Sequence, residues 1–302
     1  MKICSRLWEN VMRIYNLGSL NIDYVYDVDH FVSAGETLSS DKMQIFPGGK
    51  GLNQSVALAR AGAEVIHGAV IGEDGGFLTE ILSSAGVDTS RIETIPRRCG
   101  HAVIQVDKSG QNCILLYPGT NRCIDRRYIE NFLSDAERDD ILVVQNEISG
   151  LDIAFETAHR KNMRIAFNPS PFHSDIKKLP LSLVRWLFCN ETEGEALFGS
   201  RDIREITERF ITQIPDGDLI LTLGKDGSVF KNREKFIAQP IFETKAVDTT
   251  AAGDTFLGYF LASVTKGESV ERSMAVASKA ASVAVSVKGA ASSIPFLRDV
   301  TV

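Results

Sequence analysis

The chain has 302 residues, of which 44% are hydrophobic and 24% are charged, so it suits one large α/β domain or two small ones. The formal net charge of −6 argues against a general nucleic-acid footprint, and no run approaches the ~18 apolar residues that a membrane span needs. Its odd number of widely spaced cysteines, without a C-x-x-C pair, favours a reduced, cytoplasmic compartment: Cys4, Cys99, Cys113, Cys123 and Cys189.

The first residues are expected to lie outside the fold. Glu9 and Asn10 interrupt any apolar core in residues 1–10, so this segment does not resemble a signal peptide. A strand-like run begins near Met12. We therefore expect residues 1–12 to be an N-terminal extension and residues 13–302 to form a single domain.

Segments with strand character alternate with segments of helical period along most of the chain. The expected strands are 13–18, 65–71, 140–145, 164–168, 186–190 and 219–223, and the expected helices are 52–61, 77–84, 152–161, 203–214 and 256–264. This alternation predicts a mostly parallel sheet with helices on both faces, which is a three-layer α/β/α fold. Ligands of such sheets bind beyond the carboxyl ends of the strands. Polar residues near those ends are therefore candidates: Asn21, Asp23, Glu147, Asn168, Asn190 and Thr222.

Two regions break the alternation. Residues 23–46 contain short extended pieces without a helical period, and residues 101–107 and 111–117 have the pattern of a hairpin joined through Lys108-Ser109-Gly110. Together they predict a small β-sheet beside the α/β core. Such a sheet would form a lid, with segments at about 23–47 and 97–120.

A glycine-rich segment precedes the first expected helix, at residues 47–54 (Pro-Gly-Gly-Lys-Gly-Leu-Asn-Gln). Its glycines let the backbone approach a ligand closely, and Lys50 and Asn53 supply hydrogen-bonding groups for hydroxyls. The alternative is a simple turn before a helix. The chain contains neither a P-loop nor the dinucleotide fingerprint that an oxidoreductase on a similar sheet would carry.

Three further segments combine polar residues with strand ends. Asn21 and Asp23 face one way from an extended segment and suit sugar hydroxyls, although an Asx turn explains them equally well. Residues 190–193 (Asn-Glu-Thr-Glu) fit an N-cap, or a Mg²⁺–phosphate neighbourhood in which Glu193 acts through waters. Residues 221–227 (Leu-Thr-Leu-Gly-Lys-Asp-Gly) fit a nucleotide-binding turn or a plain β-turn.

The most informative stretch is residues 247–256 (Val-Asp-Thr-Thr-Ala-Ala-Gly-Asp-Thr-Phe). A glycine-containing turn that opens a helix presents unpaired N–H groups and the positive end of the helix dipole. Asp254 is out of place at such an anion site unless it takes a proton from a hydroxyl during phosphoryl transfer. The alternative, a simple N-cap, does not explain the run of small residues with Asp248 upstream.

These motifs resemble those of the ribokinase-like (PfkB) carbohydrate kinases. The two signatures of that family match Gly-Gly-Lys-Gly-x-Asn-Gln at 48–54 and Asp-Thr-x-Ala-Ala-Gly-Asp-Thr-Phe at 248–256. Residues 168–171, 190–193 and 288–290 also resemble family segments, and the resemblance covers about residues 13–298. It implies a β lid that closes over the sugar and pairs with the lid of a second subunit in a homodimer.

The resemblance also implies roles for individual residues. Asp254 matches the catalytic base, and Ala252 and Gly253 match its anion hole. The positions that hold sugar hydroxyls are Asn21, Asp23, Gly49, Lys50, Asn53, Glu147 and Asp254. The positions that contact ATP are Asn190, Thr222, Gly224, Gly227, Gly253 and Ser278. A potassium ion would be held, largely through backbone carbonyls, by Asp248, Thr250, Ala284, Val287, Gly289 and Ser293, and Mg²⁺ would contact Glu193 through water.

The implied activity is ATP-dependent phosphorylation of the primary hydroxyl of D-ribose to ribose 5-phosphate, with Asp254 as general base. His101, Tyr117 and Pro118 depart from the residues usual in the lid of this family. A kinase for another small sugar or a nucleoside therefore stays open as an alternative, as does a catalytically silent sugar-binding homologue. The expected partners are the sugar and ATP, with no nucleic acid and no membrane.

Overall fold

The computed structural model describes residues 12–302. The expected N-terminal extension, apart from Met12, lies outside the described residues, as does Cys4. Within the described part of the chain, none of the helices is both long enough and apolar enough to cross a membrane.

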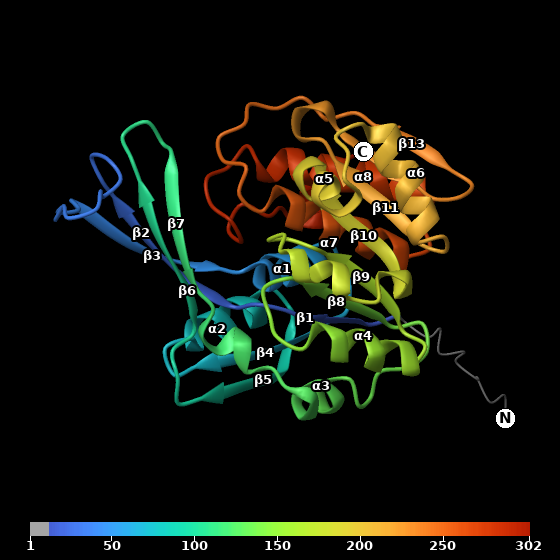
Figure 1. Ribbon diagram of the computed structural model, residues 1–302, viewed down its shortest axis with the longest axis horizontal. Helices are drawn as coiled ribbons and strands as arrows, with labels where there is room; N and C mark the ends of the chain where they lie inside the picture. The colour runs from blue at the N-terminus through green and yellow to red at the C-terminus, as the bar shows by residue number, and fades with distance from the viewer. Residues whose placement is uncertain (1–11) are drawn as a thin grey trace, which may run out of the picture.

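A nine-stranded sheet forms the centre of the described structure, with strand order β13-β12-β11-β10-β9-β8-β1-β4-β5 (Figure 1). Its strands are β1 (Ile14–Leu17), β4 (Val65–Gly72), β5 (Asp88–Ile95), β8 (Ile141–Gln145), β9 (Arg164–Asn168), β10 (Val184–Asn190), β11 (Asp218–Thr222), β12 (Ser228–Lys231) and β13 (Phe236–Gln239). Neighbouring strands are parallel from β5 to β11, and β12 and β13 add an antiparallel edge. The expected three-layer, mostly parallel fold is confirmed.

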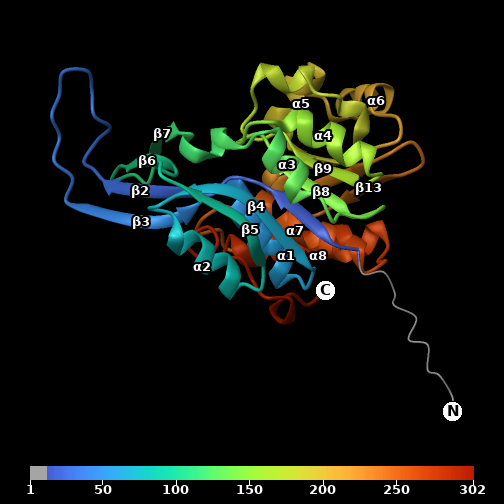
Figure 2. The ribbon, with the colours of Figure 1, turned by 90° about the horizontal axis from the view of Figure 1, so that it is seen from below.

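Helices cover both faces of this sheet (Figure 2). One face carries α1 (Lys50–Arg60), α2 (Gly76–Ser84), α7 (Ala252–Thr265) and α8 (Val270–Ala284). The other carries α3 (Arg126–Phe132), α4 (Leu151–Arg160), α5 (Glu191–Phe198) and α6 (Ile203–Gln213).

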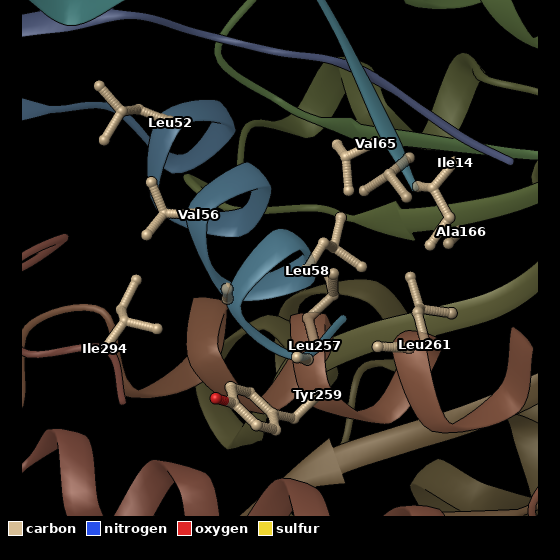
Figure 3. Packing of buried hydrophobic residues seen from close by; sticks show 14 of the residues in the cluster. Ile14, Leu52, Val56, Leu58, Val65, Ala166, Leu257, Tyr259, Leu261 and Ile294 are labelled. Atoms are coloured by element: carbon tan, nitrogen blue, oxygen red, sulfur yellow. The ribbon is translucent and has the colours of Figure 1, made fainter. Parts of the chain in front are cut away.

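The core is divided into two clusters because successive residues of a strand point to opposite faces. Ile141 and Val143 of β8 belong to the cluster beneath α1 and α7, whereas Leu142 and Val144 belong to the cluster beneath α3 and α4. Figure 3 shows the first cluster, in which α1 and α7 pack side by side against the sheet. This packing brings the first turn of α7 next to α1.

A separate four-stranded sheet projects from one side of the molecule (Figures 1 and 2). Its strand order is β3-β2-β6-β7, with β2 (Asn21–Asp27), β3 (Lys42–Gly48), β6 (Gly100–Val106) and β7 (Asn112–Tyr117). Residues 23–46 were expected to form short pieces, but they contain most of two seven-residue strands that pair along their whole length. Backbone pairing with β6 extends this hairpin, and such pairing leaves no local sequence signal.

The two faces of the small sheet differ in character. Asp23 pairs with Phe46 and with Ala102, so these side chains share one face. His101 pairs with Ile22 and Tyr117 and lies on the opposite face, where its ring centroid is 4.9 Å from that of Tyr117. The unusual His101 therefore points away from the Asp23 side of the sheet.

Candidate active site

The candidate site is organised by the first turn of α7. Ala251 is the N-cap and adopts a left-handed conformation, with φ of 60°. Asp254 follows in the first turn and is 6% exposed. The N–H of Ala252 donates to the carbonyl of Thr249 at 3.2 Å, whereas Gly253 is exposed and belongs to the donors that a helix start leaves unpaired. Of the two expected anion-hole residues, Gly253 is thus the better placed to bind a ligand.

Two side-chain amides of α1 hold the Asp254 carboxylate. Asn53 Nδ2 donates to Oδ2 at 3.1 Å, and Gln54 Nε2 donates to Oδ1 at 2.9 Å. Each oxygen of Asp254 therefore has one fixed donor and keeps a lone pair for another partner.

Lys50, the first residue of α1, lies in a strongly charged environment. Burial disfavours its ammonium charge, but the carboxylates of Asp254, Glu147 and Glu193 outweigh that effect and raise its pKa. Lys50 therefore stays a cation within the site.

Glu147, in the turn after β8, is fastened to the start of α1. Its Oε2 accepts hydrogen bonds from the Ser19 hydroxyl and from the Lys50 N–H, the latter at 2.9 Å. A carboxylate at a helix start is stabilised by the unpaired N–H groups and the dipole. This contact brings the turn after β8 to the same place as the glycine-rich segment.

The Asp23 carboxylate lies directly over the backbone of Gly48. A Cβ on Gly48 would lie 2.3 Å from Asp23 Oδ2, so only glycine leaves room for the carboxylate here. Burial, with a smaller contribution from the negative charge of Glu147, raises the pKa of Asp23 to about 7. Asp23 is therefore close to half-protonated at neutral pH.

Two connected cavities lie beside Asp254. The larger, of about 540 Å³, is lined by the expected nucleotide residues Asn190, Thr222, Gly224, Gly227, Gly253 and Ser278. The smaller, of about 240 Å³, is lined by Lys50, Glu193 and Asp254. Asn190, Thr222 and Gly253 line both cavities, so the two spaces meet at the start of α7.

The other expected sugar residues line neither cavity. Hydrogen bonds or strand pairing connect most of them to residues that line the smaller cavity. Asn53 donates a hydrogen bond to Asp254, and Glu147 accepts one from the backbone N–H of Lys50. Asn21 and Asp23 lie in β2, which pairs with the end of β3 that leads into Gly49 and α1. The sugar candidates thus gather around β2, α1 and the turn after β8, whereas the nucleotide candidates line the larger cavity.

Asn190 and Glu193 form a capping box at the start of α5. Glu193 N–H donates to Asn190 Oδ1 at 2.9 Å, and Asn190 N–H donates to Glu193 Oε2 at 3.0 Å. The structural role that the sequence allowed is therefore present. Among the described residues Glu193 Oε1 accepts no hydrogen bond, and Glu193 lines the smaller cavity, so one oxygen is left for a hydrated cation.

Asp248 joins the loop before α7 to the turn after α8. Its Oδ2 accepts the N–H of Gly289 at 2.9 Å, and its Oδ1 accepts the N–H and the hydroxyl of Thr250 at 2.9 and 2.6 Å. Partial burial opposes ionisation, but these hydrogen bonds and the charge of Lys288 outweigh it and lower the pKa of Asp248. The junction therefore carries a fixed negative charge.

The other expected potassium positions lie along the segment that follows. Ala284 ends α8 and is buried, Val287 is exposed, and the Ser293 hydroxyl donates to the carbonyl of Ala290 at 2.9 Å. The structure joins Asp248, Thr250 and Gly289 by hydrogen bonds, and among the described residues Ala284, Val287 and Ser293 make no hydrogen bond to Asp248.

Sequence reasoning missed the polar residues that support the site. Asn121 Nδ2 donates to Asn21 Oδ1 at 2.7 Å, and Gln145 Nε2 donates to Gln54 Oε1 at 2.7 Å. Gln54 lies inside the glycine-rich motif, which was a usable signal. Asn121 and Gln145 carry no signal of their own, because their partners are distant in sequence.

Known proteins resemble this chain over nearly its whole length. Residues 13–297 match the pfkB family carbohydrate kinases. A ribokinase of Haemophilus influenzae is 35% identical over 288 residues, covering 92% of this chain and 94% of the relative, and a ribokinase of Staphylococcus aureus is 34% identical, covering 95% and 98%. The structure of Arabidopsis thaliana ribokinase complexed with ribose and ATP is 27% identical, covers 96% of this chain and 97% of its own, and superposes with a TM-score of 0.83. The chain belongs to the pfkB family of carbohydrate kinases.

Proposed function

We propose that the chain transfers the γ-phosphoryl group of ATP to the primary hydroxyl of D-ribose, giving ribose 5-phosphate. One observation carries the proposal: Asp254 lies where a cavity lined by nucleotide candidates meets a polar cavity containing Lys50 and Glu193. The similarity to ribokinases, and the ribose and ATP in the Arabidopsis complex, support ribose as the acceptor.

In this proposal Asp254 takes the proton of the hydroxyl as its oxygen attacks the γ-phosphorus, and the bond to the leaving ADP oxygen breaks. Phosphoryl transfer needs mainly positioning and charge stabilisation. The N–H of Gly253, the dipole of α7 and the cation of Lys50 would stabilise the charge on the transferred group. Asn21, Asp23, Asn53 and Glu147 would orient the sugar hydroxyls.

Mg²⁺ and a monovalent cation belong to the proposal as well. The free Oε1 of Glu193 suits water-mediated contact with Mg²⁺, which when bound neutralises phosphate charge. We assign potassium to the Asp248 junction, where an ionised carboxylate joins the loop before α7 to the turn after α8 and backbone carbonyls of both segments would supply further ligands. Wild type, but not Asp248→Ala, should gain thermal stability in KCl relative to NaCl. Equal shifts in both proteins would reject this assignment.

We further propose that residues 13–302 form one domain, in which segments 23–47 and 97–120 act as a lid and pair with a second lid in a homodimer. The face that carries Asp23 also exposes Phe46, Ile114 and Leu116, with relative exposures of 38%, 51% and 53%. Apolar side chains of this kind favour a covering partner. Leu116→Asp should convert a dimer to a monomer in light scattering, and an unchanged mass would argue against the lid interface.

We also propose a cytoplasmic location for the protein. The described cysteines are free thiols, which supports that location.

The decisive experiment combines a substrate panel with Asp254→Asn, using ADP release as the readout. We expect ribose to be preferred over 2-deoxyribose, fructose and nucleosides, and Asp254→Asn to lose about 10²–10⁴-fold in kcat while still binding ribose. Preference for a nucleoside would favour the alternative kinase, and ribose binding without any turnover would favour a silent sugar-binding protein. Near wild-type turnover by Asp254→Asn would reject its role as general base.

A further inference from the structure

We propose that Gln54 is a positioning residue that holds the carboxylate of Asp254, and that a buried chain of side-chain amides fixes which end of Gln54 faces it. The inference rests on the proposed function, because it concerns the proposed base. Asn16, Gln54 and Gln145 are each 0% exposed, so none of these amides can exchange its partners for water.

The chain begins at a backbone carbonyl, which can only accept hydrogen bonds. Asn16 Nδ2 donates to the Gly51 carbonyl at 2.9 Å, so Asn16 Oδ1 must face the other way. Gln145 Nε2 donates to that Oδ1 at 2.9 Å and to Gln54 Oε1 at 2.7 Å, which uses both of its hydrogens. Gln54 is left with its Nε2 toward Asp254 Oδ1, at 2.9 Å.

A second carbonyl fixes the chain from the opposite side. Asn168 Nδ2 donates to the carbonyl of Phe188 at 2.9 Å, which turns Asn168 Oδ1 toward Gln54 Nε2 at 3.4 Å. A flip of Gln54 alone would place its oxygen against the oxygens of Asp254 and Asn168 and its amino group against that of Gln145. Gln54 is therefore held as a donor from both ends of the chain.

This arrangement serves the proposed reaction in two ways. A fixed donor on Oδ1 aims the carboxylate, and together with the Asn53 donor on Oδ2 it limits rotation of that group. The cation of Lys50 in α1 interacts with the carboxylate of Asp254 and also with those of Glu147 and Glu193. Gln54 itself is 0% exposed, so no surface of it is free to contact ATP or the sugar, and its removal should leave those contacts in place.

The test compares Gln54→Met, which keeps side-chain length but removes the donor, with Gln145→Met, which releases Gln54 from the chain. For Gln54→Met we expect the single-turnover rate of phosphoryl transfer to fall about 10–100-fold, with KM values for ATP and ribose near wild type. Gln145→Met should show the same changes to a smaller extent, and it carries the test if Gln54→Met does not fold.

Ser263→Ala is the matched control. Ser263 is a buried hydroxyl of α7 that donates only to the carbonyl of Tyr259 in its own helix, at 2.9 Å, so its loss should leave the rate and both KM values unchanged. A wild-type rate in folded Gln54→Met, or a lower rate accompanied by a matching rise of the KM values for ATP and ribose, would overturn the inference. Asp254→Asn is measured in parallel. If it is inactive while Gln54→Met behaves as wild type, only the positioning role of Gln54 is rejected. If Asp254→Asn is active, the role of Asp254 as general base is rejected.

Discussion

The side-chain amide of Asn121 fixes the orientation of Asn21. Asn121 Oδ1 accepts the backbone N–H of Leu20 at 3.2 Å, and its Nδ2 donates to Asn21 Oδ1 at 2.7 Å. Because a backbone N–H can only donate, Asn121 cannot turn around. The oxygen of Asn21 is therefore occupied, and Asn21 offers its amino group to the site.

We predict that Asn121→Asp weakens sugar binding without affecting ATP. The new carboxylate can still accept from Leu20, but it cannot donate to Asn21, which would then turn its oxygen outward. Loss of one such hydrogen bond, about 1.4 kcal/mol, corresponds to a roughly tenfold higher KM for ribose. Asn131→Asp adds the same charge at an exposed site of α3 and serves as the control. Steady-state kinetics with an unchanged ribose KM in Asn121→Asp would contradict the assigned orientation.

Gly48→Ala tests the close approach of Asp23 to the backbone. A Cβ at this position would lie within 2.4 Å of three atoms of the Asp23 carboxylate, which must then move. We expect the KM for ribose to rise at least about tenfold, because a displaced carboxylate cannot keep its hydroxyl contacts. Gly76→Ala, at a glycine with nothing within 4 Å of the added Cβ, should leave ribose binding unchanged. Equal KM values for the two variants would show that the site tolerates the movement.

The central fold could be predicted from sequence because buried parallel strands are continuous apolar runs. The expected strand at 164–168 coincides with β9, and the expected helix at 203–214 differs from α6 by one residue. The strands β5 and β13 were not predicted. They lie at the two edges of the sheet and their residues are exposed or half-buried, so no hydrophobic pattern marks them. Burial of edge strands depends on the neighbouring strand, which local sequence does not describe.

The residues of the candidate site also differ in whether the sequence predicts them. Lys50, Asn53 and Asp254 stand in contiguous motifs whose glycines and small residues are themselves informative. Asn121 acts on a residue 100 positions away, and Gln145 acts on Asn16 across 129 positions. Supporting contacts of this kind are made by the folded chain, so only the structure identifies them.

Sugar capture should depend on pH because the pKa of Asp23 is about 7. The ionised carboxylate accepts hydrogen bonds from two hydroxyls, and protonation converts one oxygen to a donor. We expect kcat/KM for ribose to fall as pH drops below about 7, approaching tenfold per pH unit. Asp23→Asn should have a lower kcat/KM at pH 8 and lack this inflection. A wild-type profile that stays flat from pH 8 to 5.5 would contradict the prediction, as would an inflection near 7 that survives in Asp23→Asn.

Acid should destabilise the fold through His67. This residue is 0% exposed on β4, its Nδ1 contacts the Ser55 hydroxyl at 2.8 Å, and burial lowers its pKa to about 3. In the unfolded chain histidine titrates near pH 6.5. Between pH 6.5 and 3, His67 is therefore protonated in the unfolded chain but neutral in the folded protein. Stability from this group is complete above pH 6.5 and falls by about 1.4 kcal/mol for each pH unit below it. Urea unfolding across this range should show a shallower pH dependence for His67→Asn, whose amide oxygen can still accept from Ser55. His173→Asn, at an exposed histidine, should keep the wild-type slope, and the same slope in all three proteins would mean that His67 titrates normally in the folded state.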